Sequence, residues 1–146
     1  MKDIMAIFYF FEVELLYMEE IFWHKRWELG EIAFHESEGN LLLKQHFDKL
    51  NLTQACRVFL PLCGKTKDIL WLLDWGVRVV GAELCESAVI ELFDELGIKP
   101  KISRLEDFSL YQAKNIDIFV GDIFKLSAKL LGLVDLVYDR AALVAL

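Results

Sequence analysis

The sequence predicts an α/β protein built on a parallel sheet, and three observations support this. An apolar run at 57–62 ends in a glycine turn at Gly64, residues 67–75 have helical spacing, and a second apolar run at 77–83 ends in one acid, Glu83. Apolar runs bounded by turns are typical of buried strands, and alternation of strands with helices gives parallel sheets with right-handed crossovers. The sequence therefore predicts a β-α-β unit at the start of such a sheet.

Two helices are predicted before this unit. In residues 19–30 the aromatic residues Phe22, Trp23 and Trp27 recur at helical spacing, and Gly30 is a stop signal. By spacing alone this is an amphipathic helix that covers a sheet. Residues 40–50 form the second predicted helix, whose apolar positions are expected in the core: Leu41, Leu42, Leu43, Phe47 and Leu50.

The elements after the first strand follow the same alternation. Residues 67–75 and 87–96 are predicted helices that end at Gly76 and Gly97. Residues 102–112 are expected to form a loop or an irregular strand. The third and fourth strands are expected at residues 116–120 and 134–138.

A ligand-binding edge is predicted where the first two strands end. Gly64 and Glu83 follow adjacent parallel strands, and open α/β sheets bind ligands at the carboxyl ends of their strands. An acid in this position can accept hydrogen bonds from both hydroxyls of a ribose. The competing interpretation is the first β-α-β unit of an α/β domain of any function.

The composition of the loop after the first strand limits the classes of ligand that this edge could bind. Gly64-Lys65-Thr66 resembles the end of a phosphate-binding P-loop, but such a loop needs a glycine five residues earlier, where Phe59 stands. A dinucleotide fold spaces three glycines for its pyrophosphate, and only Gly64 occurs here. The glycine count argues against a nicotinamide-dependent oxidoreductase, which is kept as an alternative. A ligand that contains adenosine but no phosphate fits this loop better than a nucleotide or dinucleotide does. S-adenosylmethionine is such a ligand.

Composition favours a small-molecule partner. The chain has 146 residues and a formal net charge of −7, whereas binding to nucleic acid requires a basic face. The three cysteines form an odd set without C-x-x-C spacing, so neither a metal site nor a disulfide framework is expected, which suits the cytoplasm. The apolar run at 4–11 is interrupted by Glu12 and Glu14 before the ~20 residues of a membrane span, so no membrane partner is expected.

Five segments occur in an order that resembles one family. They are Phe22-Trp23-His24-Lys25-Arg26-Trp27, Ile32-Ala33-Phe34-His35, Pro61-Leu62-Cys63-Gly64-Lys65, Val80-Gly81-Ala82-Glu83 and Asp139-Arg140-Ala141-Ala142-Leu143. Together they resemble the thiopurine S-methyltransferase family from about Glu20 to Leu146. The resemblance implies a Rossmann-like class I methyltransferase fold with helices on both faces of the sheet. It also implies methyl transfer from S-adenosylmethionine to the sulfur of thiopurines or related aromatic or heterocyclic thiols.

The resemblance also implies roles for single residues. Glu83 would bind the ribose hydroxyls. Arg140 would bind the cofactor and also act as the catalytic residue beside donor and acceptor, where its charge favours an anionic acceptor or a thiolate. Phe34 would contact the substrate. The remaining implied cofactor-binding residues are Trp27, Leu62, Gly64, Asp122 and Ile123. Two alternatives stay open: Asp122 as the N-cap of the next turn, and Arg140 in an ion pair with Asp139 or another carboxylate.

The domain organisation expected from the resemblance has three parts. Residues 1–17 are expected to be an extension outside the family pattern, 18–50 a helical N-terminal lid, and 51–146 an incomplete cofactor-binding α/β domain. The family's seven-stranded sheet implies that the last strands are missing. We therefore expect a fragment that associates, although intact relatives would be monomers, and a non-catalytic cofactor-binding fragment is the alternative function.

Overall fold

The computed structural model describes residues 20–32, 37–140 and 142–145, and the side chains of 144 and 145 are not described. Contacts divide the chain into two units, Met1–Ile32 and Ala33–Leu146. In the first unit residues 20–28 form a helix, as predicted, and the N–H of Leu29 still donates to the carbonyl of Lys25 at 3.0 Å. Gly30 follows with a φ of +68°, a left-handed conformation that ends helices.

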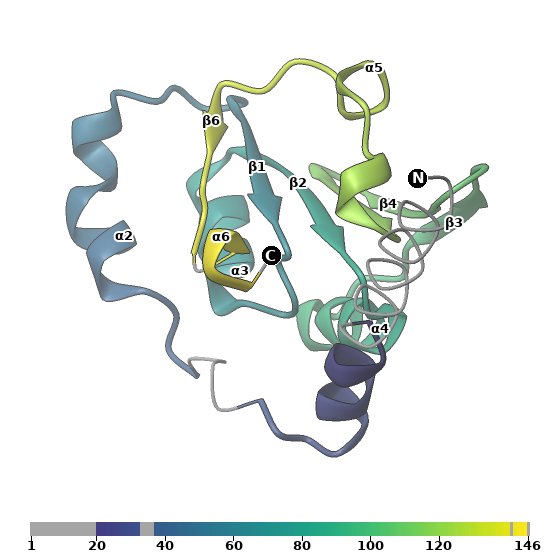
Figure 1. Cartoon of the computed structure of the whole chain (residues 1–146). Coiled ribbons are helices and arrows are strands. Elements are labelled where there is room, and N and C mark those ends of the chain that lie inside the picture. Colours follow the sequence, from purple (N-terminus) through teal and green to yellow (C-terminus); the bar gives the residue numbers. More distant parts are fainter. Residues whose placement is uncertain (1–19, 33–36, 141, 146) are drawn as a thin grey trace, which may run out of the picture. The chain divides into compact units, whose positions relative to one another are not determined.

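The second unit contains a six-stranded sheet in the order β3-β4-β5-β2-β1-β6 (Figure 1). Strands β5, β2, β1 and β6 are parallel to one another, whereas β4 is antiparallel to both of its neighbours, β5 and β3. This is an α/β Rossmann-like arrangement, so the predicted fold class is confirmed. The strands are β1 Arg57–Pro61, β2 Arg78–Glu83, β3 Lys101–Arg104, β4 Ser109–Ala113, β5 Ile116–Val120 and β6 Leu136–Val137.

The helices of this unit follow the predicted alternation with the strands. Thr66 caps α3 by accepting a hydrogen bond from the N–H of Asp68, and Gly76 ends α3 with a φ of +96°. Gly97 ends α4 in the same way, with a φ of +67°. The helices are α2 Leu41–His46, η1 Phe47–Leu50, α3 Lys67–Trp75, α4 Glu86–Leu96, η2 Ile123–Lys125, α5 Ala128–Leu131 and α6 Ala142–Ala145.

Alternate residues of the central strands enter two separate cores, because successive side chains of a strand point to opposite faces. On one face Val58 and Val79 join a large core with α3, α4 and the α2–η1 segment. On the other face Val80 and Phe119 join a smaller core with Phe108, against which parts of the 126–134 segment pack. Helices therefore cover the first face, whereas the 126–134 segment packs on part of the second face.

The expectation of a loop or an irregular strand at residues 102–112 was right only in part. This stretch forms an antiparallel hairpin of β3 and β4, and β4 pairs with β5. The hydroxyl of buried Tyr111 in β4 donates to a carboxylate oxygen of Glu86 at 2.8 Å, and burial followed by this bond raises the Tyr111 pKa to about 12. The charged, mostly exposed residues of β3 hide the strand signal, since only β4 faces the core.

The helix expected at 40–50 is broken, and only part of its apolar surface is buried. It consists of α2 followed by the 3₁₀ turn η1. Leu43 and Phe47 are buried, whereas Leu41, Leu42 and Leu50 are 65%, 64% and 45% exposed. Successive residues of a helix are turned by about 100° around its axis, so three consecutive leucines cannot all face the core. Only Leu43 does so, because it lies on the same face as Phe47, four residues later.

The fourth strand is also shorter than the five residues expected, because β6 spans only Leu136–Val137. Residues 41–50 belong to the same compact unit as the sheet, and the functional division into extension, lid and cofactor domain stays a prediction.

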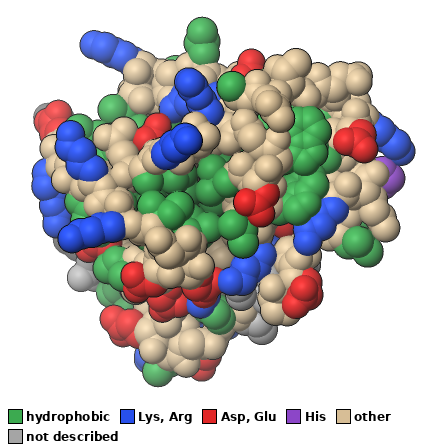
Figure 2. Space-filling view, turned by 180° about the vertical axis from the view of Figure 1, so that it is seen from behind, with side chains coloured by type: hydrophobic (Ala, Val, Ile, Leu, Met, Phe, Trp, Pro, Cys, Tyr) green, Lys and Arg blue, Asp and Glu red, His purple; other side chains and the backbone are tan. Residues whose placement is uncertain are grey.

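Figure 2 shows one face of the molecule, on which hydrophobic side chains gather at the centre among charged side chains. None of the helices in the described ranges has the length and apolar character needed to cross a membrane.

Candidate functional site

The loop that follows β1 turns sharply against the end of β2. Leu62 and Gly64 adopt φ angles of 45° and 51°, in the left-handed region. The N–H of Cys63, between them, donates to the carbonyl of Ala82 at 3.0 Å. A left-handed conformation costs a leucine about 1–2 kcal/mol, and such strain persists where the surroundings enforce it.

The carboxylate of Glu83 joins this loop to the end of β2. Its Oε2 accepts the N–H of Gly64 at 2.7 Å, and its Oε1 accepts the N–H of Cys85 at 2.9 Å. Only 6% of Glu83 is exposed. The structure thus brings together Gly64 and Glu83, which the sequence predicts at one ligand-binding edge.

Cys63 is a structural residue of the loop. Burial, followed by the negative charge of Glu83, raises the pKa of the Cys63 thiol well above its ordinary value. A buried thiol with a raised pKa is a poor nucleophile. A Cβ added at Gly81 would lie 2.8 Å from Cys63 Sγ and 2.7 Å from Ile118 Cδ1, so the glycine gives the thiol its space.

Ion pairs connect the same loop to α4. Lys65 Nζ lies 2.7 Å from a carboxylate oxygen of Glu91 and 3.0 Å from one of Glu95, and Lys67 also pairs with Glu95. The hydrogen bond with Glu91 is the main reason that the Lys65 pKa is raised, and that with Lys67 the main reason that the Glu95 pKa is lowered. The lysine that resembles a P-loop lysine is thus engaged with two carboxylates.

We expect Glu95→Gln to lower the free energy of unfolding by about 0.5–1 kcal/mol at neutral pH, because the pairs are partly exposed. Since the Glu95 pKa lies below its ordinary 4.5, the contribution is present above that pH and is lost as the pH falls through the lowered pKa. Lys65 has a pKa above its ordinary 10.5, so its contribution persists until the pH rises through that raised value. Urea denaturation of the wild type and of Glu95→Gln at neutral and acidic pH measures their free energies of unfolding. A difference between the two proteins that is the same in acid as at neutral pH would contradict the expected role of the Glu95 charge.

The turn after β5 lies beside the end of β2. The N–H of Gly121 donates to the backbone carbonyl of Glu83 at 2.9 Å. The next residue, Asp122, caps η2 by accepting the N–H of Phe124 at 2.9 Å. The N-cap interpretation of Asp122 is therefore observed, and it places Asp122 and Ile123 at the strand end next to that of Glu83.

Gly121 is needed for the shape of this turn. Its φ is +155°, and a Cβ there would lie 2.7 Å from the carbonyl oxygen of Asp107 and 2.8 Å from the Phe108 ring. We expect Gly121→Ala to cost about 1–3 kcal/mol from backbone strain, with the steric overlap in addition. Thermal denaturation measures the loss. Gly30→Ala is the control for left-handed strain alone, because no atom lies within 4 Å of its added Cβ. Equal losses in the two variants would contradict the steric argument.

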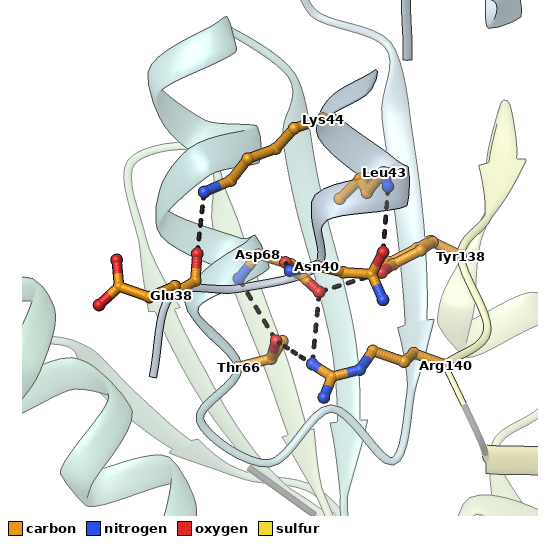
Figure 3. A network of polar contacts seen from close by, with 8 residues as sticks. All are labelled: Glu38, Asn40, Leu43, Lys44, Thr66, Asp68, Tyr138 and Arg140. Carbon is orange, nitrogen blue, oxygen red and sulfur yellow. Dashed lines mark hydrogen bonds and ion pairs between the residues drawn. The ribbon is translucent and has the colours of Figure 1, made fainter. Parts of the chain in front are cut away.

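Arg140 follows β6 and contacts the start of α3 (Figure 3). Its Nη1 donates to Thr66 Oγ1 at 3.3 Å and lies 3.6 Å from Asp68 Oδ2. The ion-pair alternative is thus observed, with Asp68 as the carboxylate. Asp139 instead accepts the N–H groups of Ala142 and Leu143, at 2.8 and 3.3 Å, at the start of α6.

Sequence reasoning missed Asp68, which is fully buried. An acid in the first turn of a helix is ordinarily explained by the helix dipole, and its burial is not visible in the sequence.

Two other predicted residues are not brought to the site by the structure. Trp27 lies in the first unit, whose placement relative to the sheet is not determined, and Phe34 lies outside the described residues.

The sheet topology makes this edge the candidate ligand site. The chain passes from β1 to β2 and onward to β5, then returns to place β6 on the opposite side of β1. The strand order therefore reverses at β1, and open α/β sheets bind ligands outside the carboxyl ends at such a point. The loop after β1, Glu83 and Arg140 all lie at these ends. An acidic acceptor beside a loop with a single glycine fits the ribose of an adenosyl ligand that carries no phosphate.

Comparison with known proteins identifies the family of the chain. Residues 18–146 match the model of the family described as Thiopurine S-methyltransferase (TPMT). A thiopurine S-methyltransferase of Xanthobacter autotrophicus is 52% identical over 130 residues, which cover 88% of this chain and 61% of the relative. Relatives of the same name from Teredinibacter turnerae and Pseudomonas syringae pv. tomato are 52% and 46% identical over 129 residues each, or 88% of this chain.

The chain spans about 60% of the length of these relatives, namely 61%, 60% and 59%. The matched part includes every described residue of the candidate site. The family match covers most of the chain, and the Rossmann-like sheet order is consistent with it. The chain therefore belongs to the thiopurine S-methyltransferase family.

Proposed function

We propose that this chain binds S-adenosylmethionine and belongs to an enzyme that methylates the sulfur of thiopurines or related aromatic or heterocyclic thiols. The observation that supports this most directly is the Glu83 carboxylate, held by the N–H groups of Gly64 and Cys85 at the end of β2, beside the strand β1 at which the strand order reverses. Glu83 would accept the ribose hydroxyls, and the loop at Leu62 and Gly64 would lie against the cofactor. Asp122 and Ile123 would border the adenine.

The protein's part in such a reaction is to bind, to orient and to exclude water. When bound, S-adenosylmethionine supplies an activated methyl group that a sulfur nucleophile can accept. Arg140, whose side chain is 23% exposed, would orient the acceptor and favour its anionic form, since a nearby cation lowers a thiol pKa. Trp27 and Phe34 are proposed to cover the cofactor and to contact the acceptor.

The proposed role of Arg140 predicts a kinetic effect. Arg140→Ala is expected to lower the single-turnover rate by about 10²-fold, the range seen when one charge-stabilising donor is removed. The affinity for S-adenosylmethionine should change much less. Arg140→Lys, which keeps the charge but loses the planar donor geometry, is the matched comparison. Its single-turnover rate should lie between those of the wild type and Arg140→Ala. An unaltered rate in Arg140→Ala would remove this residue from the site.

The experiment that tests the function combines calorimetry with transfer of a labelled methyl group to a thiopurine. The Xanthobacter autotrophicus relative serves as the longer reference protein. Binding with transfer supports the whole proposal. Binding without transfer supports the cofactor site and favours the alternative of a non-catalytic fragment. Binding of a nicotinamide dinucleotide in preference to S-adenosylmethionine would support the oxidoreductase alternative.

The proposal includes a cytoplasmic location and a small-molecule acceptor as the partner, with no nucleic acid. Cys56, Cys63 and Cys85 form no disulfide in the described part of the chain, which agrees with the proposed reducing compartment. Intact relatives would act as monomers, and association of this chain stays a prediction. Sedimentation analysis of the purified chain tests it.

A further inference from the structure

One buried carboxylate connects three segments that are distant in the sequence (Figure 3). Asp68, in the first turn of α3, is fully buried. Its Oδ1 accepts the N–H of Asn40 at 2.6 Å, and its Oδ2 accepts the hydroxyl of Tyr138 at 3.0 Å. The same Oδ2 lies 3.6 Å from Nη1 of Arg140. Asp68 therefore joins the start of α2, the start of α3 and the segment after β6.

The surroundings of Asp68 are shaped to hold a charge. A buried carboxylate is unfavourable unless hydrogen bonds and a cation compensate for its lost hydration. Two donors and one guanidinium provide this compensation. A Cβ added at Gly39, whose φ is +74°, would lie 2.8 Å from Asp68 Oδ1, so the chain approaches this oxygen as closely as a glycine allows.

The connection extends to the candidate site through two contacts. Thr66 Oγ1 accepts from Nη1 of Arg140 at 3.3 Å and from the N–H of Asp68 at 3.3 Å. Thr66 directly follows the loop that contains Gly64 and Lys65, so the guanidinium is fastened to the end of that loop and to Asp68 together. A side chain as long as arginine loses considerable rotamer freedom when it is fixed, and these contacts fix it before any acceptor arrives.

We propose that Asp68 is a positioning residue, whose buried carboxylate holds the Arg140 guanidinium in place at the carboxyl edge of the sheet. The proposal rests on the proposed function in assigning Arg140 to the acceptor. Asp68 acts through Arg140 and does not touch the reacting groups. Tyr138 supports the arrangement by donating to the carboxylate oxygen that faces Arg140.

Asp68→Asn tests the proposal because it keeps the size of the side chain and one acceptor oxygen while it removes the charge. The first measurement is the ¹⁵N heteronuclear NOE of the Arg140 Nε–H group in the full chain. It should be high in the wild type and low in Asp68→Asn, with the amides of β2 and β5 unchanged. Asp117→Asn is the matched control, since Asp117 accepts from Gln112 at 2.9 Å on β5 and should leave Arg140 unaffected.

Tyr138→Phe is the second variant, and it decides the matter if Asp68→Asn does not fold. It removes a single donor to Oδ2 and should lower the NOE of Arg140 by a smaller amount. An Arg140 signal that is equally rigid in the wild type and in every folded variant would overturn the proposal. This measurement needs no cofactor, so it remains decisive even if the chain proves unable to bind S-adenosylmethionine and the proposed function fails.

The kinetic measurement is a double-mutant cycle between Asp68 and Arg140. Asp68→Asn should lower kcat at least tenfold while the Kd for S-adenosylmethionine stays within about twofold. In an Arg140→Ala background the same substitution should cause no further loss of kcat, because the group it positions is absent. An equal loss of kcat in both backgrounds would indicate a structural role and overturn the proposal.

Discussion

Glu83→Ala is expected to weaken the binding of S-adenosylmethionine at least a hundredfold. A hydrogen bond to a charged group contributes about 1.5–3 kcal/mol, and the proposal assigns two ribose hydroxyls to this carboxylate. About 3 kcal/mol corresponds to roughly 150-fold in affinity. The substitution also leaves the N–H groups of Gly64 and Cys85 without the acceptor that now holds them, so the loop after β1 loses its anchor.

Calorimetric titration measures this effect on protein whose folding is checked by circular dichroism. Glu83→Gln keeps one acceptor oxygen and should retain part of the affinity. Glu106→Ala, at an exposed position in the β3–β4 hairpin, is the control for loss of an acid and should bind as the wild type does. A folded Glu83→Ala protein with wild-type affinity would remove Glu83 from the cofactor site.

Phe47→Ala is expected to lower the free energy of unfolding by about 3–5 kcal/mol, the range for buried phenylalanines. Phe47 is 1% exposed, and its ring packs edge-on against Trp71 and Trp75, with centroids 5.0 and 4.8 Å away. These contacts attach the α2–η1 segment to α3. The loss is a large part of the 5–15 kcal/mol that stabilises a typical domain, so the variant should be close to unfolded at 37 °C.

Chemical denaturation of the purified variants measures this difference. Leu42→Ala is the matched control from the same segment, because Leu42 is 64% exposed and should change stability by no more than about 0.5 kcal/mol. Similar losses for the two variants would contradict the observed packing of this segment. The sequence analysis predicts both Phe47 and Leu42 in the core, but the structure buries only Phe47.

The sequence was sufficient to predict the central β-α-β unit and the meeting of Gly64 with Glu83. Apolar runs mark both β1 and β2, and Gly76 and Gly97 end α3 and α4 as expected. The position of Glu83 follows from topology alone, since parallel strands end at the same edge.

The hairpin of β3 and β4 could not be predicted in the same way. Its pairing depends on contacts with β5 that local patterns do not encode, and exposed charges interrupt the apolar run of β3. Local patterns also could not identify Asp68 as the partner of Arg140, because the two residues are brought together by the return of β6 to β1. The neighbouring Asp139 was equally plausible by sequence, yet it caps α6.

The proposed function depends most on the place where an adenosyl ligand binds. Titration of S-adenosylmethionine into ¹⁵N-labelled chain, followed by amide chemical shifts, tests this directly. Perturbations should concentrate on the loop after β1, on Glu83 with Cys85, and on Asp122 with Ile123. Shifts confined to the amino ends of the strands, near Arg57 and Asn115, would contradict the account, as would unchanged spectra under conditions in which the longer Xanthobacter autotrophicus relative binds.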